Sequence, residues 1–326
     1  MTNTNTKTAL ITGANSGIGF ALAARLAKDG WGKIILACRS IEKGKSARKD
    51  LMLQTGNDPF EVLAMDTSEA ESAKQAAEDL KSLNTKIDFL VLNAGASSKD
   101  PKFNSNEVEI TYASTLVGHH VFTMEALRLG LLSEKARIVI AGSEGARGSV
   151  PGMTVHDIPA LAEENHNGQL VDAIKSLMHI KEKSQIPFRN MNEYVTAKLM
   201  VVWWTAALAK QLPSGITVNT VSPGSVLSTS FIRDGSFGMK YLMVPFMKLI
   251  GPFTGMSHSI DNAIQRFIDA YEFDDQANGY FFATANRKKL GGPMNKQMWP
   301  EYFFDNAGQE ATFKAMENLT GTPYPN

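Results

Sequence analysis

A tyrosine and a lysine lie four residues apart, Tyr194 and Lys198, in a segment with helical spacing of apolar residues. Side chains at this spacing project from the same face of a helix. A nearby ammonium group disfavours a protonated phenol, so we expect Lys198 to lower the pKa of Tyr194 toward working pH. The pair predicts a general acid/base on this helix. Taken alone, the same spacing is also typical of an exposed helix surface.

A glycine-rich turn joins the first apolar run of the chain to the first helical pattern. It reads Thr12-Gly13-Ala14-Asn15-Ser16-Gly17-Ile18-Gly19. Glycines allow a tight turn, and the N-terminus of the following helix offers free N–H groups and the positive end of its dipole. Between a strand and a helix, such a turn predicts a pyrophosphate site of a dinucleotide, formed by Gly13, Asn15, Ser16, Gly17, Ile18 and Gly19.

The end of the second predicted strand favours NADP over NAD. An NAD-binding protein usually places a carboxylate there for the ribose 2′-hydroxyl, whereas an arginine suits a 2′-phosphate. Cys38 occupies the position of the acid, and Arg39 and Ser40 follow it. The alternative interpretation is that Arg39 is an ordinary exposed residue at a strand end.

Polar and small residues also follow the third and fourth predicted strands. They are Asp66 and Thr67 in one case, and Asn93-Ala94-Gly95 in the other. The carboxyl ends of parallel strands meet at one edge of a sheet, so we expect these residues to flank the adenine and the ribose. Either segment could equally be an ordinary turn.

Strand-length apolar runs alternate with longer amphipathic segments, a pattern typical of βαβ units. The predicted strands are at about 8–12, 34–38, 60–65, 88–92, 136–141, 216–221 and 279–283. The predicted helices are at about 17–29, 42–55, 69–83, 107–132, 192–212 and 260–271. This order predicts an α/β fold: one doubly wound Rossmann-type domain, residues 1–326, with a parallel sheet. We expect two insertions, at about 148–190 and 225–258, and a C-terminal extension at about 288–326.

The composition excludes several classes of function. The 326 residues contain 33 basic and 33 acidic side chains, so no basic field exists to attract nucleic acid. Cys38 is the only cysteine, which rules out an intramolecular disulfide and fits a reducing compartment. We expect a cytoplasmic protein without a secretory signal or a transmembrane span. The apolar stretch at 237–253 contains lysines and prolines, and it could cover an apolar ligand, form a subunit contact or touch a membrane surface.

Taken together, these motifs point to one protein family. Ser143 follows the fifth predicted strand, and Asn219-Thr220-Val221-Ser222-Pro223-Gly224 follows the sixth. With the glycine turn, Asn93-Ala94-Gly95 and the Tyr194/Lys198 pair, the chain resembles the short-chain dehydrogenase/reductase family over about residues 8–230. The resemblance implies hydride transfer between NADP(H) and a carbonyl or hydroxyl carbon.

The resemblance also implies roles for individual residues. Tyr194 would pass the proton, Lys198 would bind the nicotinamide ribose, and Ser143 would hydrogen-bond the substrate oxygen and stabilise its developing charge. Five further residues would lie around the carboxamide and the phosphates: Pro223, Gly224, Val226, Ser228 and Thr229.

One position departs from the family pattern. The family usually carries an asparagine in the helix after the fourth strand, where it helps to hold a water of the proton relay, and this chain has Thr115 there. A threonine has fewer hydrogen-bonding groups. A catalytically weak NADP-binding regulatory module is therefore an alternative to an enzyme. The adjacent His119 and His120 point in different directions on a helix, so we expect packing roles and no metal site.

The stretch between Ser143 and Tyr194 is much longer than in compact members of the family. Together with the hydroxyls after Gly224, the apolar stretch and the long tail, it resembles the branch of retinol dehydrogenases and light-dependent protochlorophyllide oxidoreductases. A bulky apolar small-molecule substrate is therefore expected. The photoenzyme remains an alternative, although Met200 occupies the place of its functional cysteine.

The resemblance also suggests a subunit interface. Members of the family often form homodimers through the helices that carry Thr115 and Tyr194, and a long tail can block that surface. Trp203 and Trp204 fit a core or an interface better than a substrate site. The tail could cover either the pocket or a second subunit.

Overall fold

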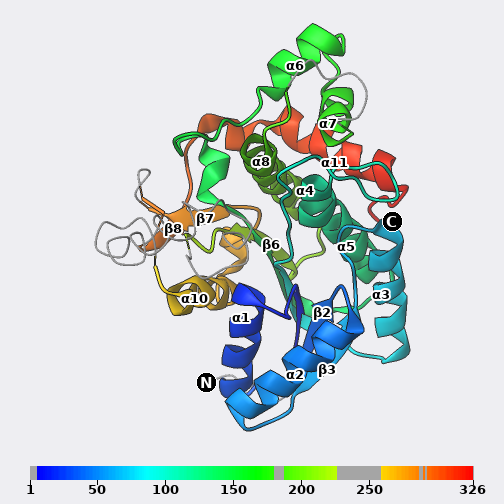
Figure 1. Ribbon diagram of the computed structural model, residues 1–326, viewed down its shortest axis with the longest axis vertical. Helices are drawn as coiled ribbons and strands as arrows, with labels where there is room; N and C mark the ends of the chain where they lie inside the picture. The colour runs from blue at the N-terminus through cyan, green and yellow to red at the C-terminus, as the bar shows by residue number, and fades with distance from the viewer. Residues whose placement is uncertain (1–5, 180–186, 226–257, 286–288, 291, 326) are drawn as a thin grey trace.

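The computed structural model describes residues 6–179, 187–225, 258–285, 289–290 and 292–325 (Figure 1). Its centre is an eight-stranded sheet with strand order β3-β2-β1-β4-β5-β6-β7-β8. The strands are β1 (Thr8–Thr12), β2 (Lys33–Cys38), β3 (Phe60–Ala64), β4 (Ile87–Leu92), β5 (Leu132–Ala141), β6 (Thr217–Val221), β7 (Phe281–Thr284) and β8 (Met294–Lys296). The first seven run parallel, and β8 pairs antiparallel with β7 at the edge.

The central strands are apolar on both faces because helices cover both sides of the sheet. Leu10 pairs with Ile35 on one side and with Leu90 on the other, and these three side chains belong to one hydrophobic cluster. The neighbouring residues Ile11 and Val91 belong to the cluster on the opposite face. Alternation along each strand therefore divides the core into two layers.

Two groups of helices cover the two faces. The helices α1 (Gly17–Lys28), α2 (Ile41–Thr55) and α10 (Ile260–Tyr271) contribute buried residues to one cluster. The helices α3 (Ala70–Ser82), α5 (Gly118–Arg128) and α8 (Asn190–Ala209) contribute to the other. Figure 1 shows α1, α2 and α10 on one side of the sheet. The predicted α/β doubly wound fold is confirmed, and its sheet is parallel as predicted except for the edge strand β8.

The helix predicted at 107–132 is wrong in its extent and in its regularity. The structure has a single turn α4 (Ile110–Tyr112), a π-helical turn η2 (Ala113–Val117) and α5, which ends at Arg128. Gly130 then takes a positive φ of 63°, and β5 begins at Leu132. The glycine reverses the chain, which an apolar pattern running on through Leu131 and Leu132 conceals.

The first insertion and the C-terminal extension contain helices that the sequence did not predict. The insertion carries α6 (Ile158–Asn165) and α7 (Leu170–Met178), and the extension carries the turn η7 (Glu301–Phe304) and α11 (Asn306–Thr320). Helix α11 packs against both α8 and α7. Most of the second insertion lies outside the described residues, and the single-domain organisation stays a prediction.

The two tryptophans of α8 belong to the core. Trp203 and Trp204 are at most 2% exposed. The Trp203 indole donates a hydrogen bond to the carbonyl of Tyr302 in η7, and the Trp204 indole donates to His120 Nδ1. The C-terminal extension thus covers the side of α8 that faces away from the sheet.

Candidate active site

The glycine turn forms an open helix N-terminus at the end of β1. Gly13 and Gly17 have positive φ angles of 68° and 57°, so both positions favour glycine. Ser16 is the N-cap of α1 but makes no side-chain capping hydrogen bond. A Cβ atom at Gly17 would have no neighbour within 4 Å. These features fit a phosphate group that approaches the backbone closely and accepts from the first N–H groups of α1.

The thiol of Cys38 lies directly under this turn. It accepts backbone hydrogen bonds from Ala14 and Asn15, and burial raises its pKa to about 11. The side chain at the position of the usual acid therefore supports the glycine turn from below. Arg39 is exposed immediately after it, and Ser40 caps α2 by accepting from the N–H of Lys43.

Asp66 and Thr67 lie in the turn that connects β3 to α3. The Asp66 carboxylate accepts hydrogen bonds from the backbone and the hydroxyl of Ser68, at 3.0 and 2.6 Å. Thr67 packs against the backbone of Gly118, where a Cβ atom would collide with the Thr67 carbonyl. Asp66 thus shapes its own turn, and Thr67 fixes the distance between this turn and the helix that follows β4.

Asn93-Ala94-Gly95 is attached to the end of β1. The hydroxyl of Thr12 accepts hydrogen bonds from the backbone N–H groups of Asn93 and Ala94, each at 2.9 Å, and the Asn93 amide donates to the carbonyl of Thr12. Thr115, in η2, faces this segment, because a Cβ atom at Gly95 would lie 3.3 Å from Thr115 Oγ1. Thr115 is fully buried at 1% exposure. The π-helical turn therefore presents Thr115 beside the end of β4, and such turns are frequent at functional sites.

His119 completes this arrangement as a neutral side chain. Its Nδ1 lies 3.1 Å from the carbonyl of Thr115, and its Nε2 lies 3.0 Å from Thr12 Oγ1. Burial lowers the pKa of His119 to about 3, and the charge of Lys198 adds to this effect. Because a carbonyl can only accept, Nδ1 carries the hydrogen and Nε2 accepts from Thr12. Among the described residues no group of three His, Cys, Asp or Glu side chains could hold a metal ion.

Ser143, Tyr194 and Lys198 meet at the end of β5. Ser143 is the N-cap of the 3-10 turn η3 (Glu144–Arg147); its hydroxyl accepts from the N–H of Gly145 at 3.1 Å and hydrogen-bonds the Tyr194 phenol. Lys198 Nζ donates to the carbonyl of Ala141 at 2.6 Å and lies 5.8 Å from the centroid of the Tyr194 ring. The three residue types that acid/base chemistry needs are therefore side by side.

The sequence predicts a lowered pKa for Tyr194, and this prediction is wrong because the pKa is raised in the structure. Burial raises the pKa of Tyr194, the hydrogen bond from Ser143 lowers it, and the charge of Glu144 raises it. Burial also lowers the pKa of Lys198 to about 7. The sequence shows the charge of Lys198, but it does not show that folding removes both side chains from water.

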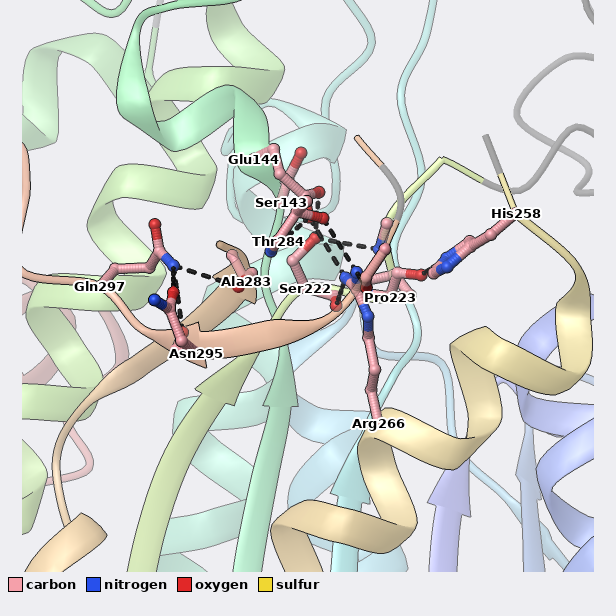
Figure 2. A network of polar contacts seen from close by, with 12 residues as sticks. Ser143, Glu144, Ser222, Pro223, His258, Arg266, Ala283, Thr284, Asn295 and Gln297 are labelled. Carbon is pink, nitrogen blue, oxygen red and sulfur yellow. Dashed lines mark hydrogen bonds and ion pairs between the residues drawn. The ribbon is translucent and has the colours of Figure 1, made fainter. Parts of the chain in front are cut away.

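Sequence reasoning missed a buried polar network beside Ser143 (Figure 2). Glu144 forms an ion pair with Arg266 of α10 at 3.2 Å, and both side chains are only 5% exposed. The same carboxylate accepts from the hydroxyls of Ser222 and Thr284 at the ends of β6 and β7. A signal for this network existed in the sequence, because Arg266 lies on the apolar face of α10 with Ala263, Phe267 and Ala270.

The segment after β6 is part of the same neighbourhood. Gly224 has a positive φ of 73°, and its N–H donates to Ser222 Oγ at 3.1 Å. His258 hydrogen-bonds the carbonyl of Pro223. Three residues predicted to contact the cofactor, Val226, Ser228 and Thr229, lie outside the described residues, as does the apolar stretch at 237–253.

The first insertion is attached to the N-terminal part of α8, next to Tyr194. His156 Nε2 lies 3.0 Å from the carboxylate of Glu193, and the backbone N–H of His156 donates to the Thr196 hydroxyl. The Tyr112 phenol donates to the other Glu193 oxygen at 2.7 Å. The insertion is thus fixed to the helix that carries Tyr194 and Lys198.

Comparison with known proteins gives consistent relatives. The sequence profile described as short chain dehydrogenase matches residues 7–156. The chain is 27% identical over 240 residues to the short chain dehydrogenase sol3 of Alternaria solani, covering 72% of this chain and 78% of the relative. It is 25% identical to the chloroplastic protochlorophyllide reductase of Chlamydomonas reinhardtii, covering 75% of this chain and 62% of that protein. It is 28% identical to the WW domain-containing oxidoreductase of Danio rerio, covering 76% of this chain and 55% of that protein.

Solved structures share the fold. An uncharacterized protein from Mycobacterium Paratuberculosis has a TM-score of 0.70 at 18% identity, covering 98% of this chain and 95% of the other. A short chain dehydrogenase from Burkholderia cenocepacia, solved in complex with NADP, has a TM-score of 0.58 at 21% identity, covering 86% and 96%. In the described part of the chain, no helix combines the length and the apolar character needed to cross a membrane. The profile match, the curated relatives and the shared fold agree, and the chain is similar to the short-chain dehydrogenase/reductase family of NAD(P)-dependent oxidoreductases.

Proposed function

We propose that this chain is an NADP(H)-dependent oxidoreductase that transfers hydride between the nicotinamide and a carbonyl or secondary alcohol of a bulky apolar substrate. The observation that carries the proposal is the contact between the Ser143 hydroxyl and the Tyr194 phenol, with Lys198 one helical turn further along α8. The Tyr194 phenol can donate a proton to the substrate oxygen, which gains negative charge as the carbonyl is reduced. The Ser143 hydroxyl can donate a hydrogen bond to the same oxygen.

In the reducing direction, Tyr194 donates its phenolic proton to the substrate oxygen. The raised pKa keeps the phenol protonated at neutral pH, which is the form an acid needs. The Ser143 hydroxyl stabilises the charge that develops on the same oxygen. Lys198, with a pKa of about 7, can be charged or neutral near physiological pH and thereby adjusts the ease with which Tyr194 gives up its proton. Bound NADPH would supply the hydride.

The preference for NADP rests on the end of β2. The Cys38 side chain is buried beneath the glycine turn and leaves no carboxylate for a ribose 2′-hydroxyl, while the exposed guanidinium of Arg39 is available for a 2′-phosphate. The open N-terminus of α1 suits the pyrophosphate.

The preference for a bulky apolar substrate rests on the sequence and on the first insertion. The apolar stretch at 237–253 follows the cofactor-binding segment, and the insertion lies against the helix of Tyr194. Aromatic and methionine side chains adapt to large apolar ligands.

The test is a Tyr194→Phe variant with a panel of bulky apolar aldehydes, ketones and quinones. We expect the wild-type protein to oxidise NADPH with at least one of them and the variant to lose at least about a hundredfold in turnover while it retains NADPH affinity. Tyr271→Phe, which removes a phenol from α10, is the matched control and should keep full activity. Retained turnover in Tyr194→Phe would contradict the role of this phenol.

Two alternatives have their own outcomes in the same assay. A catalytically weak NADP-binding module is favoured by Thr115, whose carbonyl is already engaged by His119; saturable NADPH binding without turnover would support it. A light-dependent reaction is motivated by the likeness to the Chlamydomonas protein, although Met200 is fully buried in the core. NADPH oxidation with protochlorophyllide only under illumination would support that reaction.

A further inference from the structure

Glu144 is a buried carboxylate directly after Ser143, and both of its oxygens have partners. Its side chain is 5% exposed. Oε1 accepts from Arg266 and from the backbone and hydroxyl of Thr284, while Oε2 accepts from the hydroxyl of Ser222. A charge removed from water in this way is retained only with such a complete set of partners.

Arg266 joins four segments around this carboxylate. Its NH1 donates to Glu144 and to the carbonyl of Ser222 at 2.8 Å, and its NH2 donates to the Thr284 hydroxyl and to the carbonyl of Gly292, each at 2.8 Å. Figure 2 shows the ion pair at the ends of neighbouring strands, between α10 and η3. The network therefore holds the ends of β6 and β7 at a fixed position relative to Ser143.

One branch of the network leads to the segment we assign to the nicotinamide. The N–H of Gly224 donates to Ser222 Oγ at 3.1 Å, and the Ser222 hydroxyl in turn donates to Glu144. Gly224 has little freedom to move, because a Cβ atom there would lie 2.6 Å from the carbonyl of Leu290. Two hydrogen bonds thus connect the backbone after Pro223 to the residue that follows Ser143.

We propose that Glu144 is a positioning residue that, through Ser222, holds the Pro223-Gly224 segment in register with Ser143. This inference rests on the proposed function, since it assigns cofactor contact to Pro223-Gly224 and substrate contact to Ser143. One buried carboxylate then aligns the two halves of the site before either ligand binds, which lowers the cost of ordering them. The negative charge of Glu144 also raises the pKa of Tyr194.

The competing explanation is that the network only stabilises the packing of α10 on the sheet. Ser222 and Thr284 separate the two explanations, because both donate a hydroxyl hydrogen bond to Glu144 but only Ser222 continues to Gly224. In Thr284→Val the backbone N–H of residue 284 still donates to Glu144. This substitution is therefore the matched control for Ser222→Ala.

The experiment is a double-mutant cycle read by NADPH affinity, measured by fluorescence titration of the full chain. We expect Glu144→Gln and Ser222→Ala each to weaken NADPH binding about tenfold, and the double variant to be little weaker than either single one. Thr284→Val should change the affinity less than about twofold. Additive losses in the double variant, or an equal loss in Thr284→Val, would overturn the inference.

A second readout does not depend on turnover. Ultraviolet titration of the phenol, taken as the difference from Tyr194→Phe, should give a lower Tyr194 pKa in Glu144→Gln than in the wild-type protein, because a negative charge is removed. An unchanged titration would show that the Glu144 charge does not act on Tyr194, and the affinity cycle decides the positioning role. Ser222→Ala, which retains the ion pair, keeps the affinity test open if Glu144→Gln does not fold.

The outcomes separate this inference from the proposed function. Coupled affinities in a protein without turnover support the positioning role and contradict the oxidoreductase reaction. Turnover that depends on Tyr194, combined with additive affinities, supports the reaction and overturns the role of Glu144.

Discussion

His119 Nε2 accepts a hydrogen bond from the Thr12 hydroxyl, and this contact joins the helix after β4 to the end of β1. The same hydroxyl accepts from the N–H groups of Asn93 and Ala94. A single neutral imidazole therefore orders the hydrogen bonds at the ends of two central strands and at the π-helical turn of Thr115.

The first prediction concerns stability in acid. Burial lowers the pKa of His119 to about 3 and that of His120 to about 4, both below the value of an unfolded histidine. Protons therefore bind the unfolded state first as the pH falls below about 6.5, and stability that is present above that pH is lost. We expect each histidine to remove about 2 kcal/mol of unfolding free energy between pH 7.5 and pH 5.

Urea unfolding at several pH values measures this effect. His120→Phe should show a smaller loss between pH 7.5 and pH 5 than the wild-type protein, even though it is less stable at pH 7.5, where it lacks the hydrogen bond to Thr322. An identical pH slope in the two proteins would contradict the assignment of His120 as a buried neutral side chain.

The second prediction concerns the cost of burying Lys198. Its pKa of about 7 lies well below that of an unfolded lysine, so holding it in the core costs stability at neutral pH. We expect Lys198→Met to increase the free energy of unfolding by about 1–3 kcal/mol at pH 7, after loss of the hydrogen bond to Ala141. At pH 9 this gain in unfolding free energy should be smaller by about 2 kcal/mol, because burial of Lys198 destabilises the wild-type protein less at that pH.

Urea unfolding tests this, with Lys74→Met as the control, since Lys74 is exposed on α3. The control should change stability by no more than about 0.5 kcal/mol. Lower stability of Lys198→Met at pH 7 would count against a costly buried ammonium group.

The third prediction concerns cofactor choice. Arg39→Ala should weaken NADPH binding by about tenfold to a hundredfold and leave NADH binding nearly unchanged, because only NADPH carries the 2′-phosphate. Fluorescence titration with both cofactors measures it. Lys43→Ala, an exposed cation in the first turn of α2, is the control, and an equal loss of both cofactors in Arg39→Ala would remove the proposed role.

The fourth prediction concerns the oligomeric state. Helix α11 packs on α8, and Gly308 is so close to Trp203 that a Cβ atom would lie 2.9 Å from the indole ring. We expect a monomer, because the chain's own extension covers the surface that a partner would need. Gly308→Val should displace α11 and produce dimers or larger species in size-exclusion chromatography with light scattering. Ala307→Val, at an exposed position of the same helix, should stay monomeric; dimers of the wild-type protein would contradict the expectation.

Much of the fold could be predicted because its signals are local. Short apolar runs located seven strands, the glycine turn located the start of α1, and an amphipathic pattern located α10. The edge strand β8 escaped because only Met294 of its three residues is apolar. Helix α6 escaped although Asp157 caps it and a proline occupies its first turn, a signal that was available.

The candidate site likewise contains residues that the sequence predicts and residues that it does not. Ser143, Tyr194 and Lys198 follow from motifs that are short in the sequence. The Glu144–Arg266 pair does not, because its members are 122 positions apart and meet only when α10 packs on the sheet. The predicted direction of the Tyr194 pKa shift was wrong, because burial depends on the three-dimensional surroundings of the phenol.

The hydrogen bond from Gly145 gives the Ser143 hydroxyl a direction. One lone pair of its oxygen is taken by the Gly145 N–H, and a hydroxyl has a single hydrogen to give. The hydrogen can point to the Tyr194 oxygen or to a substrate oxygen, but not to both at once. When a substrate binds, the Ser143 hydroxyl therefore donates to the substrate oxygen instead of to the Tyr194 oxygen. Loss of the hydrogen bond from Ser143 by itself raises the pKa of the phenol.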